Sequence, residues 1–412
     1  MPKIIFVNRF FYPDLSATSQ ILTDLAKDLS SRGMEICVVT GTQAYDDPSR
    51  TYPRSACVDG VNVTRIATSR FGRARLFGRL FDYLTFYIGA AWHLLRVVRP
   101  GDVVVAKTDP PLISVVAAAV SRWRGAILIN WIQDLFPEVA QSLGVLANQI
   151  VGTGLRRLRN ASLKPARWNV VIGDRMAERL LAEGIPNHRI RVIPNWSNGE
   201  EIRPIEREAN ELIEHWDLAG KFVVGYSGNM GRAHEFGTLM KAAELLGQNP
   251  DIIFLLIGDG AQRASILREI QSRGLKNVVL KPYQSKSVLN LSLGVPHVHV
   301  VSLHPQLEGL IVPSKFYGIA AAGRPTLYIG ASIGEIPGLL ETHQCGWTFA
   351  PGRSLDLANH ICHLASNADL VKDTGNRARR VFEQHFDRPV AMSRWRETFE
   401  GALSPRPQTL YH

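Results

Sequence analysis

Short runs of apolar residues alternate along this chain with longer segments in which apolar residues recur at helical spacing. The run KIIFVN is followed by a polar turn over residues 12–16, by ILTDLAKDLSSRG with helical periodicity, and by the apolar run MEICVVTG. This order predicts a strand, a helix and a second strand. Ligands bind beyond the carboxyl ends of parallel strands joined by helices, so we expect the turn to face a binding cleft.

The same alternation continues through two halves of the chain. The first half contains the predicted strands VNVTRIA, DVVVAK, ILINWI, WNVVIG and IRVIPN. After the polar segment NGEEIRPIEREANELIEHW, the second half contains KFVVGYSG, IIFLLIGDG, NVVLKP, HVHVVSL and PTLYIG. The pattern predicts an α/β protein with two Rossmann-like, doubly wound domains over residues 1–200 and 201–378. The helices expected over residues 379–412 would cross back to the first domain.

Composition and targeting signals indicate a cytoplasmic protein. The 412 residues exceed one ordinary hydrophobic core, and 45% hydrophobic with 20% charged residues is typical of a soluble globular chain. The four cysteines stand far apart, in no metal-binding spacing, which fits a reducing compartment. The start MPKIIFVNRF has no signal-peptide cleavage site, and no stretch approaches the roughly 20 apolar residues of a spanning helix.

Several common catalytic classes lack their sequence signatures here. No GxGxxG follows the first strand, and no P-loop, HExxH or GxSxG is present, which argues against dehydrogenases, P-loop kinases and serine hydrolases. The turn GYSGNMGRAH over residues 225–234 instead combines glycines, which allow close backbone approach to an anion, with Arg232 and His234. It predicts a phosphate site; the alternative is an ordinary tight turn.

Two further segments strengthen the phosphate interpretation. IGDG over residues 257–260 ends an apolar strand, although alone it is more typical of a helix start. In IVPSKFYGIAAAGRP, residues 311–325, Ser314 and Lys315 open an alanine-rich helix. A lysine is unfavourable at the positive end of a helix, so its presence indicates an anionic ligand. The alternative is a solvated surface charge.

Six motifs together carry a resemblance to a known family: FYPDLSATSQ, NWIQDLFPE, RVIPNWSN, YSGNMG, LLIGDG and PSKFYGIAAAGRP. They resemble retaining glycosyltransferases of family GT4, particularly the branch that builds bacterial capsular and colanic-acid-like polysaccharides, and the resemblance covers nearly the whole chain. It implies a GT-B fold, two Rossmann-like domains with a deep cleft between them. It also implies transfer of a sugar, from a UDP-sugar by preference, to a lipid-linked saccharide in exopolysaccharide, capsule or O-antigen assembly.

The resemblance places the donor on the second domain, with its diphosphate between the glycine-rich turn and the PSK helix. The residues expected there are Gly228, Asn229, Arg232, His234, Asp259, Gly260, Tyr283, Gln284, Glu308, Ser314, Lys315 and Gly318. Backbone groups at Tyr283 and Gln284 would hold the base. With no Asp-x-Asp motif in the sequence, no metal or other cofactor is expected, and side chains must stabilise the leaving diphosphate.

Three positions depart from the family pattern. The familiar Arg and Lys of the turn fall on Asn229 and His234, so Arg232 and Lys315 become the expected diphosphate cations, with His234 as a weaker third. The Glu that holds ribose falls on Gly318, and Glu308 is the substitute that we consider. The usual glycine pair of the first turn appears as Ser16, Ala17 and Thr18, which we expect on the acceptor side.

In the first half, Asp134 directly follows the strand ILINWI and is expected to face the cleft between the domains. Its predicted role is to bind sugar hydroxyls or to stabilise the positively charged sugar as the diphosphate departs. We count it with Arg232 and Lys315 as catalytic. Glu138, which we expect on the acceptor side, is the alternative acid. A simple helix cap is the alternative role for Asp134.

Positive charge is concentrated in the first half. Residues 1–200 carry 25 Lys and Arg against 16 Asp and Glu, a balance of +9, whereas residues 201–412 carry 22 against 21. The segment RFGRARLFGRLFDYL, residues 70–84, alternates arginines with apolar residues as interfacial membrane helices do. We expect contact with anionic lipid on the inner face of the cytoplasmic membrane through Arg70, Arg73, Arg75, Arg79, Arg156 and Arg157. Solvated helices are the alternative, and no nucleic-acid-binding motif is present.

Two other functions fit the same fold. A nucleotide-sugar epimerase would need several acids and a histidine in the cleft for proton transfer. A catalytically silent sugar-nucleotide binder is conceivable because of Gly318 and His234. Fold alone does not separate these from a glycosyltransferase.

Overall fold

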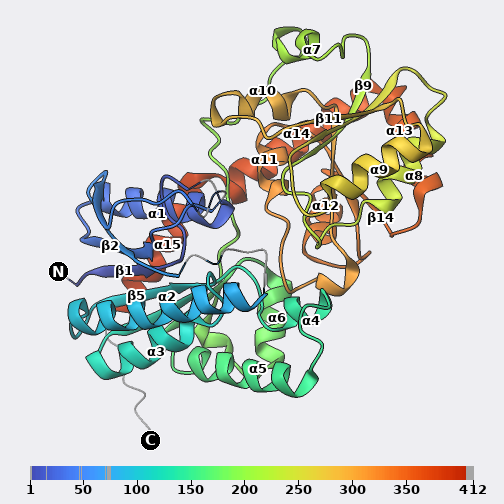
Figure 1. The fold of residues 1–412 in the computed structure, drawn as a ribbon. Helices are drawn as coiled ribbons and strands as arrows, with labels where there is room; N and C mark the ends of the chain where they lie inside the picture. Colours follow the sequence, from blue (N-terminus) through green and yellow to red (C-terminus); the bar gives the residue numbers. More distant parts are fainter. Residues whose placement is uncertain are drawn as a thin grey trace, which may run out of the picture. The chain divides into compact units, whose positions relative to one another are not determined.

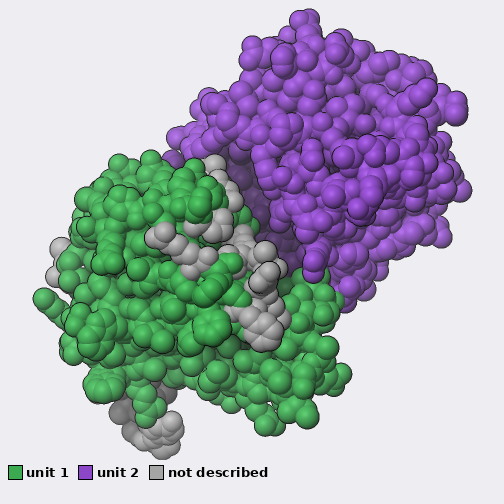
Figure 2. Space-filling model, viewed as in Figure 1, with its two compact units in different colours: residues 1–194, 392–412 green, residues 195–391 purple. Residues whose placement is uncertain are grey.

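The computed structural model describes residues 2–14, 16–45, 47, 49–69, 71 and 76–404. Its internal contacts divide the chain into two compact units (Figures 1 and 2). Unit 1 comprises residues 1–194 and 392–412, and unit 2 comprises residues 195–391. The chain therefore passes between the units twice, after Pro194 and after Ala391.

Unit 1 is built on an eight-stranded sheet in the order β3-β4-β2-β1-β5-β6-β7-β8. All neighbouring strands are parallel except β3 and β4. The strands are β1 (Ile4–Val7), β2 (Ile36–Gly41), β3 (Ser55–Val58), β4 (Val61–Ile66), β5 (Val103–Lys107), β6 (Ile127–Ile132), β7 (Trp168–Val171) and β8 (Ile190–Val192). The order reverses between β1 and β5, which is where ligands bind in such sheets.

Helices cover both faces of this sheet because successive strand residues point to opposite sides. On one face, Ile5 and Val7 pack with Phe86 and Leu94 of a long helix. On the other, Phe6 contacts Phe399 of the C-terminal helix. The helices are α1 (Ala17–Ser31), α2 (Leu76–Val97), α3 (Ile113–Arg124), α4 (Glu138–Ser142), α5 (Gln149–Leu163), α6 (Asp174–Ala182), the 3-10 turn η1 (Asn187–Arg189) and α15 (Arg388–Leu403).

Unit 2 contains a fully parallel six-stranded sheet in the order β11-β10-β9-β12-β13-β14. Its strands are β9 (Phe222–Ser227), β10 (Ile252–Ile257), β11 (Val278–Lys281), β12 (Val298–Ser302), β13 (Thr326–Ile329) and β14 (Gly346–Phe349). The strand order reverses between β9 and β12. The prediction of two Rossmann-like, parallel-sheet halves is confirmed.

The helices of unit 2 pack on two core clusters, one that includes Leu239, Ile266 and Phe254 and one that includes Ile213, Val223 and Leu255. They are α7 (Leu212–His215), α8 (Gly237–Leu245), α9 (Arg263–Arg273), α10 (Leu289–Gly294), α11 (Lys315–Ala321), α12 (Glu335–His343), α13 (Ser354–Ala365) and α14 (Ala368–Val381). Short turns are η2 (Arg207–Ala209), η3 (Lys286–Val288), η4 (Pro305–Leu307) and the π-helical η5 (Phe382–Phe386).

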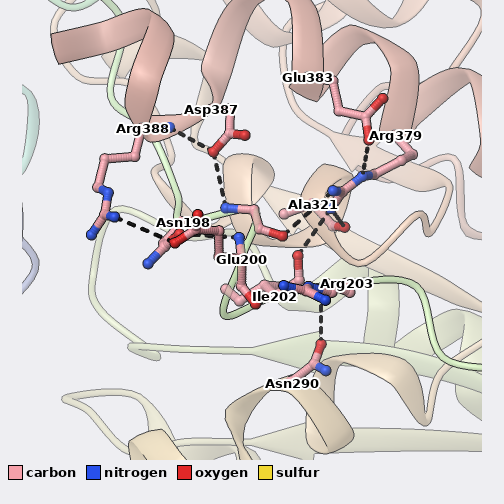
Figure 3. A network of polar contacts seen from close by, with 11 residues as sticks. Asn198, Glu200, Ile202, Arg203, Asn290, Ala321, Arg379, Glu383, Asp387 and Arg388 are labelled. Atoms are coloured by element: carbon pink, nitrogen blue, oxygen red, sulfur yellow. Dashed lines mark hydrogen bonds and ion pairs between the residues drawn. The ribbon is translucent and has the colours of Figure 1, made fainter.

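The two connecting segments of the chain are fastened to each other within unit 2, as Figure 3 shows in part. The Asp387 carboxylate accepts a hydrogen bond from the Gly199 amide at 2.9 Å. Ser197 donates its amide to Phe386 O at 3.2 Å, and Arg388 donates its amide to Ser197 O at 3.0 Å. The segment that enters unit 2 and the segment that leaves it therefore lie side by side.

Arg379 on α14 joins this connection to the C-terminal end of α11 (Figure 3). Its Nη1 donates to Ala321 O at 2.6 Å and to Ile202 O at 2.9 Å. Its Nη2 donates to Gly199 O at 3.5 Å, and its Nε pairs with Glu383 at 2.8 Å. The Arg379 guanidinium thus donates hydrogen bonds to three carbonyl oxygens that are not paired within a helix or a sheet.

Replacing Arg379 by Met should destabilise unit 2 because these carbonyl groups lose a charged donor. The expected cost is about 2–4 kcal/mol. Arg353→Met is the matched control, since its pair with Asp356 lies on the surface, and it should cost no more than about 0.5 kcal/mol. Urea unfolding measures both variants. Equal midpoints for the two would contradict a structural role for Arg379.

Candidate functional site

The structure brings the predicted donor-binding segments to one edge of the unit 2 sheet. The glycine-rich turn follows β9, the Gly-Asp-Gly segment follows β10, and Tyr283 and Gln284 follow β11. Lys315 begins α11 and lies beside the glycine-rich turn, since a Cβ added to Gly228 would be 3.5 Å from Lys315 Cε. These strand ends flank the reversal between β9 and β12, where a doubly wound sheet binds its ligand.

Two glycine turns interlock at this edge. Gly228 N donates to Ile257 O at 2.9 Å, and Met230 N donates to Asp259 O at 2.7 Å. A Cβ at position 258 would lie 2.1 Å from Gly228 O, and one at Gly260 would lie 2.4 Å from Asn229 Oδ1. Glycine is therefore required at both positions. The backbone of this edge is fixed by its own contacts before any ligand arrives.

Lys315 contacts the glycine-rich turn through a tyrosine. Its Nζ donates to Tyr226 Oη at 2.5 Å and lies 4.1 Å from the centre of that ring. Tyr226 in turn donates to Asn229 O at 2.7 Å. Tyr226 was not among the predicted site residues, although it lies within the turn over residues 225–234 and begins the motif YSGNMG. The sequence signal for it is therefore its place in that motif.

His234 is the second partner of Lys315, with Nε2 at 3.2 Å from Nζ. Its Nδ1 lies 2.6 Å from Ser302 O. A carbonyl oxygen only accepts, so we assign the proton to Nδ1, which leaves Nε2 to accept from Lys315. Burial, then the charge of Lys315, lower the pKa of His234 to about 3. In the protein without ligand, His234 is thus a neutral partner of Lys315, and its role as a third cation beside a diphosphate stays a prediction.

The two partners of Lys315 are both neutral, which sets the chemistry of its amine. Burial lowers the pKa of Lys315 to about 7. Lys315 Nζ donates one hydrogen bond to Tyr226 and one to His234, which leaves a third position on the nitrogen. That position holds a proton when the group is an ammonium ion and a lone pair when it is a neutral amine. An anion at this position favours the ammonium. Binding of a diphosphate would therefore be coupled to uptake of a proton.

This coupling predicts how nucleoside diphosphate affinity depends on pH. Below pH 7 the free protein already carries the Lys315 proton; above pH 7 binding must restore it, so affinity should fall by up to about tenfold per pH unit. Calorimetry in buffers of different ionisation enthalpy measures the uptake directly. Lys315→Met should abolish the uptake that appears above pH 7. Equal uptake in wild type and Lys315→Met would contradict the assignment.

The other predicted donor residues surround this centre in different ways. Asn229, Arg232, Asp259 and Ser314 are exposed, and within the described ranges Arg232 has no hydrogen bond or ion pair. The Tyr283 hydroxyl donates to Asp259 O at 3.4 Å, and Tyr283 as a whole is about half exposed. Gln284 donates its side-chain amide to Pro282 O at 2.8 Å. These side chains are available at the edge, and their contacts with a nucleotide stay predictions.

Glu308 has structural partners in unit 2. Its Oε1 accepts from the Glu335 amide at 2.8 Å, at the start of α12, and its Oε2 accepts from the Tyr328 hydroxyl at 3.1 Å. A Cβ on Gly318 would make ordinary contacts, 3.6 Å from Leu293 and 3.8 Å from Ser197. A role for Glu308 in ribose binding would have to coexist with these two hydrogen bonds, and it stays a prediction.

Asp134 lies beyond the carboxyl end of β6 in unit 1 and lines a small cavity with Ser114, Asn130 and Arg159. Its Oδ1 is buried, and no group of the described residues donates a hydrogen bond to it. Burial, and then the charge of Asp109, raise the pKa of Asp134 to about 7. An unsatisfied carboxyl oxygen with a raised pKa is characteristic of functional rather than structural acids.

The alternative acid and the first turn have structural partners. Glu138 forms an ion pair with Arg159 at 2.6 Å, and both side chains are largely buried. Ser16 caps α1, accepting from the Ser19 amide at 3.3 Å, while Ala17 is exposed and Thr18 is partly buried. Asp134 is therefore the better candidate for chemistry in unit 1, and the acceptor-side assignments of Ser16, Ala17, Thr18 and Glu138 stay predictions.

Replacing Asp134 by Asn keeps the size of the side chain and removes its charge. If the carboxylate stabilises a positively charged sugar, transfer should fall by about 10- to 100-fold while nucleotide affinity is kept. The wild-type rate should rise with pH through the Asp134 pKa near 7, and the variant should lack this rise. Glu138→Gln is the control for loss of a nearby acid. Unchanged turnover in Asp134→Asn would show that the residue is structural.

Comparison with known proteins gives matches in both units. Residues 17–196 match the family described as "Glycosyl transferase 4-like domain", and residues 221–367 match "Glycosyl transferases group 1". The chain is 30% identical over 314 residues to a probable glycosyltransferase WbjE of Pseudomonas aeruginosa, covering 74% of this chain and 76% of that protein.

Two more distant relatives extend over most of the chain. A putative colanic acid biosynthesis glycosyl transferase, WcaI of Escherichia coli K12, is 23% identical over 354 residues, covering 82% of this chain and 86% of that protein. The crystal structure of Anabaena Alr3699/HepE in complex with UDP-glucose superposes with a TM-score of 0.73 at 17% identity, covering 97% of this chain and all of that chain. At this identity the structural likeness shows the fold alone.

Proposed function

The chain belongs to the glycosyltransferases that combine a glycosyl transferase 4-like domain with a group 1 domain, and we propose that it transfers a sugar from a nucleoside diphosphate sugar to a lipid-linked saccharide. It is a transferase with the GT-B fold. The proposal concerns the donor, the acceptor and retention of the anomeric configuration.

The observation that carries the donor proposal is the contact of Lys315 with Tyr226 and His234 beside the glycine turns. Breaking a sugar–diphosphate bond builds negative charge on the leaving group, and donors fixed in advance stabilise that charge best. Lys315 offers one free amine position at an edge whose backbone is already fixed. We assign the leaving diphosphate to this position, with exposed Arg232 as the second cation.

UDP-sugars are the proposed donors, and side chains rather than a metal are proposed to balance the diphosphate charge. The Anabaena protein with the same fold binds UDP-glucose, which makes this donor the first to test. Among the described residues, no three His, Cys, Asp or Glu side chains are grouped to bind a metal. Retention of the anomeric configuration is part of the same proposal and is read from the product by NMR.

The acceptor and the location are proposed together. One relative is named for colanic acid biosynthesis, and we propose a lipid-linked saccharide of exopolysaccharide, capsule or O-antigen assembly as the acceptor.

The proposed location is the cytoplasmic face of an anionic membrane. Arg157 is exposed, and Arg156 pairs with Glu183 at 3.6 Å. Arg79 is partly buried at the start of α2, whereas Arg70, Arg73 and Arg75 lie outside the described residues. In the described chain, no helix has the length and apolarity to span a bilayer.

Lys315→Ala should lower turnover by about 10- to 100-fold, because a charge-assisted bond to phosphate contributes roughly 1.5–3 kcal/mol. Lys315→Arg should restore little activity, since a planar guanidinium does not fit between Tyr226 and His234. Arg232→Ala and the double variant complete the set. The effects of residues that share one leaving group should not simply add. Wild-type affinity and rate in Lys315→Ala would remove this residue from the site.

The whole proposal is tested by incubating the wild-type protein with a panel of nucleotide sugars, with and without membrane lipid acceptors. We expect release of nucleoside diphosphate that depends on the lipid acceptor and that persists when EDTA is present. Interconversion of sugars without an acceptor would contradict transfer. Loss of activity with EDTA and recovery with Mg²⁺ would contradict the proposal that side chains alone balance the charge.

A further inference from the structure

The outward face of helix α2 in unit 1 is apolar for most of its length. Five large side chains on this face are more than half exposed: Leu80 (52%), Phe81 (56%), Leu84 (51%), Ile88 (62%) and Trp92 (60%). Phe81, Leu84, Ile88 and Trp92 follow one another at intervals of three or four residues, and Leu80 lies four residues before Leu84, so the five side chains form one stripe along the helix. We call these five residues the α2 stripe. Exposed apolar residues scattered singly are ordinary on soluble proteins, but a continuous row of this size marks an interaction surface.

The α2 stripe is distinct from the face with which α2 packs on its own sheet. Phe86, Ala90 and Leu94 form that inner face and are fully buried. Asp82, the one acidic residue of α2, is also buried, where it pairs with Arg9 at 3.6 Å and accepts from the Ser69 hydroxyl at 2.7 Å. From Leu80 to Trp92 the outward face therefore presents no charge. The fold of unit 1 does not require this second apolar face.

Arginines lie at both ends of the stripe. Arg79 precedes it, and Arg96 follows it with its guanidinium 4.1 Å from the centre of the Trp92 ring. Arg99 is exposed just beyond the helix. An uncharged apolar centre with cations at its ends matches the layering of a phospholipid surface, where acyl chains lie beneath phosphates. A tryptophan covered by an arginine is suited to the boundary between the two layers.

We propose that the α2 stripe inserts into the surface of an anionic bilayer, with α2 parallel to the membrane and Arg79 and Arg96 at the phosphates. This deepens the membrane location proposed above, because it names the inserting surface and makes the attachment apolar as well as ionic. The stripe occupies one side of a helix whose other side belongs to the protein core, which is the arrangement of an interfacial helix.

Apolar insertion and purely ionic attachment respond differently to salt. Ionic contacts of exposed arginines are screened at high salt, whereas burial of hydrocarbon is not. Sedimentation with vesicles of phosphatidylglycerol and phosphatidylcholine should therefore leave a bound fraction of wild-type protein at high salt. Exchanging Phe81, Ile88 and Trp92 for Gln together should weaken partitioning on the order of a hundredfold.

The matched control exchanges two equally exposed apolar residues of unit 2, Ile333 (74%) and Leu355 (60%), for Gln. It should bind vesicles as the wild type does. The circular dichroism and unfolding midpoint of the triple variant show that it is folded. These measurements need neither donor nor acceptor, so their outcome is independent of whether transfer to a lipid-linked saccharide is correct.

Brominated lipids locate the insertion directly. They should quench part of the tryptophan fluorescence of the wild type. The Trp92→Phe variant should show no such quenching, although seven other tryptophans remain. Vesicle binding of the triple variant equal to that of the wild type at high salt would overturn the proposal. So would a wild-type dimer that the triple variant converts to a monomer without any loss of vesicle binding, since the stripe would then join two copies of the chain.

Discussion

The contact between Lys315 Nζ and the hydroxyl of Tyr226 connects the parts of unit 2 that form the candidate donor site. Tyr226 holds the glycine-rich turn through Asn229 O, and Lys315 begins the helix α11. Both partners of Lys315 are neutral, and no carboxylate of the described residues pairs with it. An incoming diphosphate would therefore meet a cation that lacks a counterion. The donor site therefore depends on how this one amine is held.

The fold supports that amine from several sides. The interlocked glycine turns fix the backbone beside Lys315, because any side chain at Gly258 would collide with Gly228 O. At the other end of α11, Arg379 holds the Ala321 carbonyl together with the segment by which the chain enters unit 2. The helix is thus held at its start by the contacts of Lys315 itself and at its end by a polar contact that does not involve the ligand position. Such prior order is what electrostatic stabilisation of a leaving group requires.

The sequence predicted much of this arrangement, and physical reasons explain what it did not. Apolar periodicity predicted both parallel sheets, and glycines before a helix predicted the turns. Tyr226 was missed because its partner stands 89 residues away, and local patterns carry no information about such contacts. The neutral state of His234 follows from its burial and from the charge of Lys315, and both depend on residues far apart in the sequence. Its contact with Ser302 O determines which ring nitrogen carries the proton. For α2, both faces are apolar, so periodicity alone did not distinguish the core face from the outward stripe.

The most direct test of the account observes the Lys315 amine itself. NMR of protein labelled with ¹³C at lysine Cε, with Lys315→Arg used to assign the resonance, gives the pKa of Lys315 with and without a nucleoside diphosphate. We expect a pKa near 7 in the free protein, as burial beside two neutral partners requires, and a clear rise when the nucleotide binds. A pKa that the nucleotide leaves unchanged would contradict the assignment of the diphosphate to Lys315.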